Sequence, residues 1–465
     1  MPELLLTHGY FMFGDPKEMQ ILKPYAPLGL LYLCSHLRAQ GFDVDVFDTT
    51  FSTRDMLFHH LRSEKPSVLG VYANLMTRRN VVDILGVAKE AGWRTVVGGP
   101  EPGAYAQEYL EAGADFVVFG EGEITMQELL QAYRAGASDS VAGIAGIAFL
   151  DENGIMRQTM PRAQIADLDA QPWPARDAID IQRYVRTWRE AHGQGSVSLI
   201  TARGCPYKCR WCSHQVFGMT HRRRNPVIVV DELEFLMQRY SPDMAWVADD
   251  VFTIHHGWIR KYAAEMKRRG LHIPFECISR ADRLNEEMLD LLAELGCFRI
   301  WIGSESGSQR ILDAMERGVK VEQVQKSIEL SRARGIQSGM FLMWGYEDEQ
   351  LTDIEATIEH VKRSQPDIFF TTVAYPIKGT PYYEKVRDRL VQLNAWNTSS
   401  DRELRIKGRH SRRFYDHADR LLRDEVALTQ LTRQNATDPH AIAALESRIR
   451  SEREGMASTY TEVEA

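Results

Sequence analysis

The stretch SVSLITARGCPYKCRWC, residues 196–212, joins an apolar run of strand type to three closely spaced cysteines. Cys205, Cys209 and Cys212 follow the spacing C-x3-C-x2-C and make up half of the six cysteines in the chain. The first of them comes four residues after the expected strand, at the carboxyl end where α/β folds place their ligands. This stretch therefore predicts a metal-binding loop at the start of a β-α domain.

The β-α rhythm continues on the carboxyl side of this loop. Further strand-like runs begin at Ala245, Phe275, Phe298, Gly339 and Ile368, with helical patterns such as NEEMLDLLAELG between them. Eight such units close a complete barrel, so six units over residues 195–395 predict a partial (β/α)6 barrel of the TIM type, open along one side.

Residues 1–150 show the same alternation on the amino side. Strand-like runs begin at Glu3, Asp43, Ser67, Arg94 and Phe116, and the helical patterns between them end in glycines, as helix C-termini often do. Five β-α units at this spacing predict an α/β domain with a doubly wound, Rossmann-like parallel sheet.

Two segments interrupt the rhythm. Residues 151–194 are rich in Pro, Asp and Gln and predict a hairpin followed by an inter-domain linker. Residues 396–465 lack strand-like runs and predict a small helical C-terminal region whose last residues, about ten, form a disordered tail.

The composition excludes several classes of protein. With 26% charged residues and a net charge of −8, the chain offers no basic surface for nucleic acid. No apolar run is long enough for a membrane span, and the N-terminus lacks the features of a signal peptide. The cysteines do not form a disulfide framework, so we expect a cytoplasmic protein with thiols available for metal.

Three thiolates in one tight loop fit two kinds of metal site. They can ligate three irons of a [4Fe–4S] cluster and leave the fourth iron open for a small molecule. The alternative is a non-enzymatic, zinc-bound adaptor with His214 as the fourth ligand. Structural zinc sites usually divide their ligands between two separated knuckles, so the spacing favours the cluster.

The motif CPYKCRWC, with Trp211 before the last cysteine, resembles the signature of radical S-adenosylmethionine (SAM) enzymes. The resemblance implies a catalytic [4Fe–4S] cluster on Cys205, Cys209 and Cys212, whose open iron binds SAM. In that family an electron from the cluster cleaves SAM to a 5′-deoxyadenosyl radical, which abstracts hydrogen from the substrate. It also implies an electron donor such as flavodoxin or ferredoxin.

Further segments resemble the SAM-binding loops of the same family, namely WVADDVF, ISRADRL, IGSESGSQRIL and VAYPIKGTPYY. Turn formation and helix capping also explain these residue types at strand ends. The loop MWGYEDEQ departs from the usual GxPGE, so the resemblance assigns no SAM contact to a residue of that loop. The implied SAM-binding residues are Trp211, Asp249, Asp250, Ser279, Arg280, Glu305, Tyr375 and Pro376.

The N-terminal half resembles the cobalamin-binding domain of B12-dependent radical SAM enzymes, through segments such as VVGGPEP and DFVVFGEGEITMQELL. The usual D-x-H-x-x-G motif is missing from the sequence, so no histidine is expected below the cobalt. His8, at the end of the first strand, is the remaining candidate neighbour. The implied cobalamin-binding residues are Leu28, Gly29, Asn74, Leu75, Met76, Thr77, Gly98, Gly99, Pro100, Gly120, Glu121 and Gly122.

The resemblance implies a methyltransferase acting on an unactivated carbon of a small molecule, lipid or tetrapyrrole. A non-methylating enzyme that forms or contracts a ring, like the anaerobic cyclases, is the alternative within the group. Trp301, Trp344, Tyr346 and Tyr375 are aromatic candidates for the substrate pocket, although core packing explains them equally well.

Overall fold

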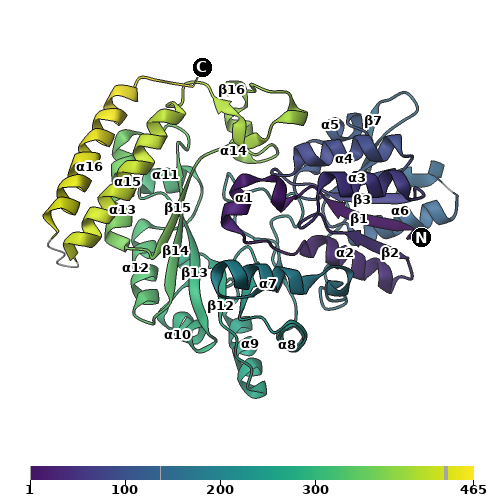
Figure 1. The fold of residues 1–465 in the computed structure, drawn as a ribbon, viewed down its shortest axis with the longest axis horizontal. Helices are drawn as coiled ribbons and strands as arrows, with labels where there is room; N and C mark the ends of the chain where they lie inside the picture. Colours follow the sequence, from purple (N-terminus) through teal and green to yellow (C-terminus); the bar gives the residue numbers. More distant parts are fainter. Residues whose placement is uncertain (1, 137, 434–437, 465) are drawn as a thin grey trace. The chain divides into compact units, whose positions relative to one another are not determined.

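The computed structural model describes residues 2–136, 138–433 and 438–464, which form two compact units (Figure 1). The first unit contains Met1–Pro206, Ser213–Ala248 and Asn394–Arg402. The second contains Tyr207–Cys212, Asp249–Leu393 and Glu403–Ala465. These units cut across the boundaries expected at residues 195 and 395, because the chain passes between them several times.

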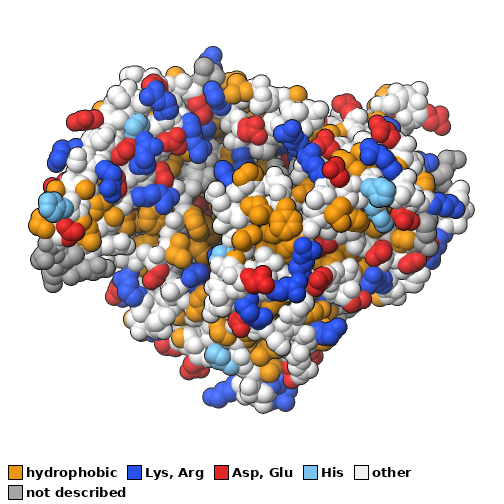
Figure 2. Space-filling view, in the orientation of Figure 1, with side chains coloured by type: hydrophobic (Ala, Val, Ile, Leu, Met, Phe, Trp, Pro, Cys, Tyr) orange, Lys and Arg blue, Asp and Glu red, His pale blue; other side chains and the backbone are white. Residues whose placement is uncertain are grey.

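Charged side chains of both signs are mixed over the face shown in Figure 2, with hydrophobic side chains between them. This agrees with the near balance of 56 basic and 64 acidic residues. Within the described part of the chain, every helix is too short or too polar to cross a membrane.

The first unit contains a seven-stranded sheet in the order β2-β1-β3-β4-β5-β6-β7. The first five strands in the chain pair in parallel, and β6 and β7 add an antiparallel hairpin beside β5. The strands are β1 (Leu4–His8), β2 (Val44–Phe47), β3 (Val68–Tyr72), β4 (Arg94–Gly98), β5 (Phe116–Val118), β6 (Ile147–Leu150) and β7 (Met156–Gln158). This confirms the doubly wound sheet, with its switch point between β1 and β3, where such folds bind ligands.

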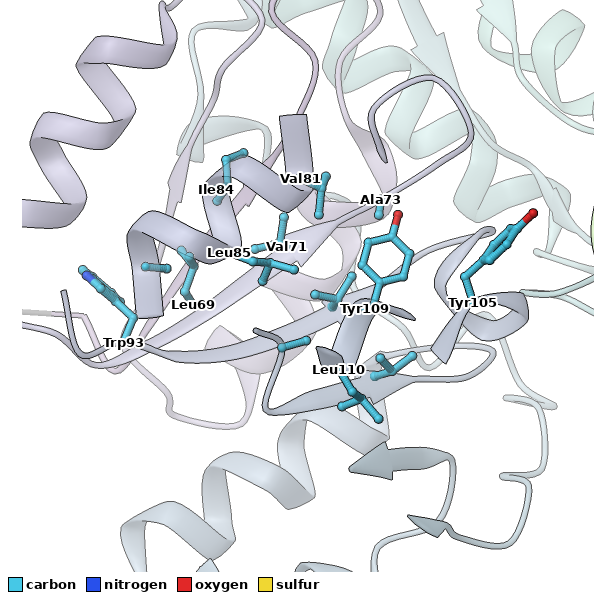
Figure 3. Close-up of a cluster of buried hydrophobic side chains, with 14 of the residues drawn as sticks. Leu69, Val71, Ala73, Val81, Ile84, Leu85, Trp93, Tyr105, Tyr109 and Leu110 are labelled. Atoms are coloured by element: carbon cyan, nitrogen blue, oxygen red, sulfur yellow. The ribbon is translucent and has the colours of Figure 1, made fainter. Parts of the chain in front are cut away.

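Helices connect these strands and bury one face each against the sheet. Val81, Ile84 and Leu85 of α4 pack on Leu69 and Val71 of β3, as Figure 3 shows. Such burial supplies most of the stability of a helix of this length. The helices are α1 (Pro16–Ile21), α2 (Leu28–Ala39), α3 (Arg54–Ser63), α4 (Arg78–Glu90), α5 (Ala106–Glu111) and α6 (Glu123–Arg134).

The segment expected as hairpin and linker contains both a hairpin and a helix. The hairpin is β6–β7, which begins at Ile147, before the expected segment. The linker contains α7 (Ile181–His192), which buries Ile181, Tyr184, Val185 and Trp188. The sequence missed α7 because the Pro- and Asp-rich residues before it hide its apolar spacing.

A second sheet has six strands in the order β15-β14-β13-β12-β11-β8. The register of the described pairs is parallel. The strands are β8 (Ser196–Leu199), β11 (Met244–Val247), β12 (Phe275–Ser279), β13 (Cys297–Glu305), β14 (Gln337–Trp344) and β15 (Ile368–Val373). The helices between them are α8 (Pro226–Tyr240), α9 (His256–Arg269), α10 (Glu286–Glu294), α11 (Gln309–Ala314), α12 (Val321–Arg332) and α13 (Leu351–Ser364). The partial (β/α)6 barrel is confirmed.

The C-terminal region is helical, as expected, but its tail is ordered. After α14 (Pro381–Val386) and the short pair β16 (Leu390–Val391) and β17 (Arg405–Ile406), α15 (Arg412–Arg433) and α16 (Pro439–Thr459) lie side by side (Figure 1). Val463 bridges to His410, and the Glu464 carboxylate lies 2.9 Å from Nη2 of Arg409. The expectation of a disordered tail is therefore wrong for residues 456–464, because a buried ion pair holds them; Ala465 lies outside the described residues.

Candidate functional site

The cysteine loop begins at a short antiparallel pair. In this pair, β9 (Ala202–Arg203) lies against β10 (Arg222–Arg223), with Arg203 opposite Arg222. Gly204 then turns the chain at φ +85°, and a Cβ there would collide with the carbonyl oxygen of Thr220. Only glycine permits this conformation and this approach. Cys205 is the next residue.

Two carboxylates, one in the loop after β5 and one at the start of α6, hold the base of the cysteine loop. Arg203 Nη1 donates to Glu121 Oε1 at 2.7 Å, and its Nη2 lies 2.7 Å from Glu123 Oε1. Arg222 Nη1 donates to the other Glu121 oxygen, also at 2.7 Å. Both oxygens of Glu121 are thus bound to arginines, and its contact with cobalamin stays a prediction.

Cys209 lies between two buried guanidinium groups. Its Sγ is 3.8 Å from Nη1 of Arg280 and 3.7 Å from Nη1 of Arg317. A hydrogen bond from the Cys212 thiol, together with these two cations, lowers the pKa of Cys209 to about 5 against the opposing effect of burial. The two guanidinium groups thus favour the thiolate form of Cys209, the form that binds iron.

Arg280, expected to pair with the SAM carboxylate, is 1% exposed and is used within the protein. Its Nε donates to Asp282 at 2.9 Å, its Nη2 donates to the Arg317 carbonyl at 2.8 Å, and its guanidinium lies 3.6 Å above the Tyr207 ring. These contacts aim Nη1 at Cys209. A contact between Arg280 and SAM stays a prediction.

Glu305 ends β13 beside this pair in a left-handed conformation, φ +63°. Burial raises its pKa to about 7, although Arg317 favours the charged form. Arg317 Nε lies 3.8 Å from Glu305 Oε1, and no hydrogen-bond partner is found for this Nε among the described residues. Glu305 can therefore accept or donate a hydrogen bond near neutral pH, as the expected contact with ribose hydroxyls requires.

Sequence reasoning missed Arg317. It lies in the turn between α11 and α12, outside any motif, and its Nη2 donates to the Gly303 carbonyl at 2.8 Å. A Cβ on Gly303 would lie 2.6 Å from Arg317 Nη2, so the glycine makes room for the guanidinium. The only sequence signal is this glycine two residues before Glu305.

The other expected SAM residues lie at strand ends. Ser279 ends β12 and its hydroxyl is 2.5 Å from that of Thr253. Asp249 is buried and Asp250 exposed after β11, while Tyr375 and Pro376 follow β15. Trp211 packs beside the buried core around Tyr346, at a ring distance of 6.4 Å. Their contacts with SAM stay predictions.

This donor set suits a [4Fe–4S] cluster. Cys212 lies beside Cys209, and two buried cations contact Cys209 Sγ, where they offset the negative charge that thiolate-bound iron brings. Hydrogen bonds to cluster sulfurs are also one of the means by which proteins set cluster potentials.

In the first unit, the loop after β3 closes on itself at the switch point. Asn74 Oδ1 accepts from the backbone N–H groups of Met76 and Thr77 at 2.9 and 3.1 Å, and Thr77 Oγ1 accepts from that of Asn74 at 3.0 Å. Met76 is left 59% exposed at the tip. Leu75 and Met76 are thus available for an apolar ligand face, whereas Asn74 and Thr77 fold the turn.

Glycine-bearing strand ends complete this edge. Gly99 has φ +122°, and a Cβ there would collide with the Ala73 carbonyl, so glycine lets the ends of β3 and β4 approach. The remaining expected cobalamin residues lie at the start of α2 (Leu28, Gly29), at the end of β4 and just after it (Gly98, Pro100), and after β5 (Gly120, Gly122).

His8 is hydrogen-bonded on both ring nitrogens. Its Nε2 lies 3.1 Å from Asp48 Oδ1 and its Nδ1 lies 2.9 Å from Thr49 Oγ1. It is 3% exposed. The structure therefore gives His8 a structural role at the end of β1. The expected lack of a histidine below the cobalt stays a prediction.

Two family models match the chain: the radical SAM superfamily over residues 199–361 and the B12 binding domain over residues 20–130. The chain belongs to the cobalamin-dependent radical SAM enzymes. Its cofactors are accordingly a [4Fe–4S] cluster, SAM and cobalamin, and the zinc-bound adaptor is excluded.

Relatives of this radical SAM enzyme include an uncharacterized methyltransferase, PH0819, of Pyrococcus horikoshii, 29% identical over 82% of this chain and 83% of its own length. The anaerobic magnesium-protoporphyrin IX monomethyl ester cyclase of Cereibacter sphaeroides is 27% identical over 80% of this chain and 62% of its own length. The fold is similar to that of TsrM, a radical SAM methyltransferase from Kitasatospora setae solved with cobalamin and a [4Fe–4S] cluster. That similarity has a TM-score of 0.69 at 21% identity and covers 83% of this chain and 75% of the other.

Two of the aromatic pocket candidates of this radical SAM enzyme lie in its core. Trp344 and Tyr346 are 1% and 0% exposed, and Tyr346 stacks on Tyr382 at a ring distance of 4.4 Å. Trp301 lies on the other face of the sheet from Trp344.

Proposed function

We propose that this enzyme transfers a methyl group to an unactivated carbon of a small molecule, lipid or tetrapyrrole. The observation that carries the proposal is the bond of Glu121 and Glu123 to Arg203, two residues before Cys205. It ties the loop after β5 of the B12-binding domain to the base of the cluster loop. Methyl transfer needs both cofactors held in one place.

Each cofactor and each residue of the site would have a separate role in this reaction. When bound, the cluster and SAM supply a carbon-centred radical and cobalamin supplies the methyl group. Arg280 and Arg317 hold the Cys209 thiolate, and Glu305 offers a hydrogen bond to the ribose of SAM. Leu75 and Met76, whose side chains the loop after β3 leaves accessible, would hold the corrin by apolar contact.

Ring formation is the second candidate. It is favoured by the likeness to the cyclase of Cereibacter sphaeroides over 80% of this chain. Product mass separates the two reactions: methyl transfer adds one CH2 to the substrate, whereas cyclisation without methylation does not.

The first test is reconstitution without oxygen. We expect iron and acid-labile sulfide in the native protein, and loss of SAM cleavage in Cys205→Ala, Cys209→Ala and Cys212→Ala. Cys34→Ala, which changes a buried cysteine of α2, should retain both. Formation of 5′-deoxyadenosine by any of the three loop variants would refute the cluster assignment.

The electron donor is proposed to be flavodoxin or ferredoxin, and the compartment to be the cytoplasm, since none of the six cysteines, all of which the structure describes, forms a disulfide. Reduced flavodoxin should support SAM cleavage by the reconstituted enzyme. Cleavage that proceeds with dithionite but with neither protein would contradict this choice of donor.

A further inference from the structure

Three aromatic rings gather on adjacent strands of the second unit. Trp301 of β13, Phe341 of β14 and Phe370 of β15 lie in nearly parallel planes. The Trp301 ring is 5.3 Å from that of Phe341 at 17° and 5.5 Å from that of Phe370 at 15°. Gly339 leaves the space for this, because a Cβ there would collide with the indole. Together the rings form an offset stack, here called the aromatic surface.

This aromatic surface is graded in exposure. Trp301 is 9% exposed, and its Nε1 donates to Glu276 at 2.9 Å, which fixes the indole in orientation. Phe341 is half-buried and Phe370 is 53% exposed. The rings of a core cluster are normally all buried, whereas Phe370 is exposed. Exposed apolar groups beside a functional site commonly mark a binding surface.

The neighbours of Phe370 show which face of the sheet carries the rings. Arg423 of α15 lies 5.3 Å from the Phe369 ring, and Thr371 donates to Asp419 of α15. Since side chains alternate along a strand, α15 covers the face opposite Phe370.

The same alternation links the aromatic surface to the cluster site. On β13, Trp301 and Gly303 share one face. A β-bulge interrupts the alternation before Glu305, but a Cβ on Gly303 would meet both Arg317 and Glu305, so these two groups lie on the same face. Arg317 in turn contacts Cys209. The rings therefore lie on the face of the sheet that also carries the groups around Cys209.

We propose that Trp301, Phe341 and Phe370 bind a planar conjugated ring of the substrate. The proposal rests on the proposed function and names its substrate class. Parallel rings stack with a flat π system in offset geometry, whereas a flexible lipid chain gains only contact area. The continuity with the Cys209 site assigns the surface to the substrate.

Equilibrium dialysis of the reconstituted enzyme tests this, with protoporphyrin IX, indole and oleate as probes. Phe370→Leu keeps an apolar side chain but removes the ring, so a planar probe should bind about tenfold more weakly. Phe369→Leu is the matched control, with the same change on the opposite face, and should bind as the parent does. Phe341→Leu provides a second variant if Phe370→Leu is unstable.

The probes distinguish the two sources of a planar ring. Ring-dependent binding of protoporphyrin indicates a tetrapyrrole-sized ligand, and ring-dependent binding of indole alone indicates a smaller ring; either supports the proposal. Tighter binding of oleate than of both planar probes, no binding of either, or equal binding by Phe370→Leu and parent overturns it. SAM cleavage is measured separately, without any probe. Its loss would contradict the proposed function, whereas normal SAM cleavage with no ring-dependent binding would contradict only the proposed substrate class.

Discussion

The chemistry of the cysteine loop depends on two buried arginines. Cys209 has guanidinium nitrogens at 3.7 and 3.8 Å, and Arg317 supplies the nearer one. In Arg317→Met one cation is lost, so an added electron on the cluster is less stabilised. We expect the midpoint potential to fall by about 40 to 60 mV, which corresponds to about 1 kcal/mol for one electron. A redox titration followed by electron paramagnetic resonance measures it.

Arg210→Met is the matched control for Arg317→Met. Arg210 is adjacent to Cys209 in sequence, but its side chain is 35% exposed and pairs with Glu316. The solvent screens such a charge, so its removal should leave the potential unchanged. Equal shifts in both variants would show that net charge, and not the contact with Cys209, sets the potential.

At the scale of elements, the loop between β14 and α13 shows how a departure from a family pattern is accommodated. Glu349 is buried there, and its Oε2 accepts from the Gly345 N–H at 2.6 Å. Burial raises its pKa from 4.5 to about 8, so the folded protein holds a proton that the unfolded chain releases. Stability should therefore be full below about pH 4.5 and fall as the pH rises through about 8.

The variant Glu349→Gln removes this ionisation and should flatten the fall of Tm between pH 5 and about 8. Thermal unfolding monitored by circular dichroism measures the slope. Asp348→Asn, an exposed change in the same loop, should keep the slope of the parent. An unchanged slope in Glu349→Gln would mean that another group carries the proton.

The elements themselves were largely predictable. Parallel strands buried on both faces read as apolar runs, and β1, buried at all five positions, is an example. The cysteine loop was predictable from its spacing. Arg317 and the pair Glu121–Arg203 were not, because their partners are 108 and 82 residues away in the chain and only the fold brings them together. Helix α7 and the ordered tail were not predicted, because their local composition is typical of loops and tails. The tertiary contacts that order them cannot be read from the sequence.

At the scale of the whole molecule, the C-terminal region is not a single appendage. Residues 394–402 belong to the first unit, while the chain on both sides of them belongs to the second. Arg78, at the start of α4, holds this segment: its Nη1 donates to the Ser399 carbonyl at 3.1 Å and its Nη2 to Asp401 at 2.6 Å. The guanidinium also lies 4.4 Å from the Tyr105 ring and 5.3 Å from that of Trp396.

Substitution of Arg78 should therefore free residues 394–402 and also lower the stability of the first unit. Arg78 Nε also donates to Glu101 at 2.7 Å, so Arg78→Met leaves two buried carboxylates without their cation. Breaking a buried pair in this way costs about 3 to 5 kcal/mol, which denaturant unfolding should detect. Limited proteolysis with mass spectrometry should show faster cleavage within residues 394–402. Arg79→Met, an exposed change at the next position, should alter neither the free energy of unfolding nor the rate of cleavage. If the rate of cleavage is unchanged in Arg78→Met, the aromatic contacts of Trp396 hold the segment without the ion pair.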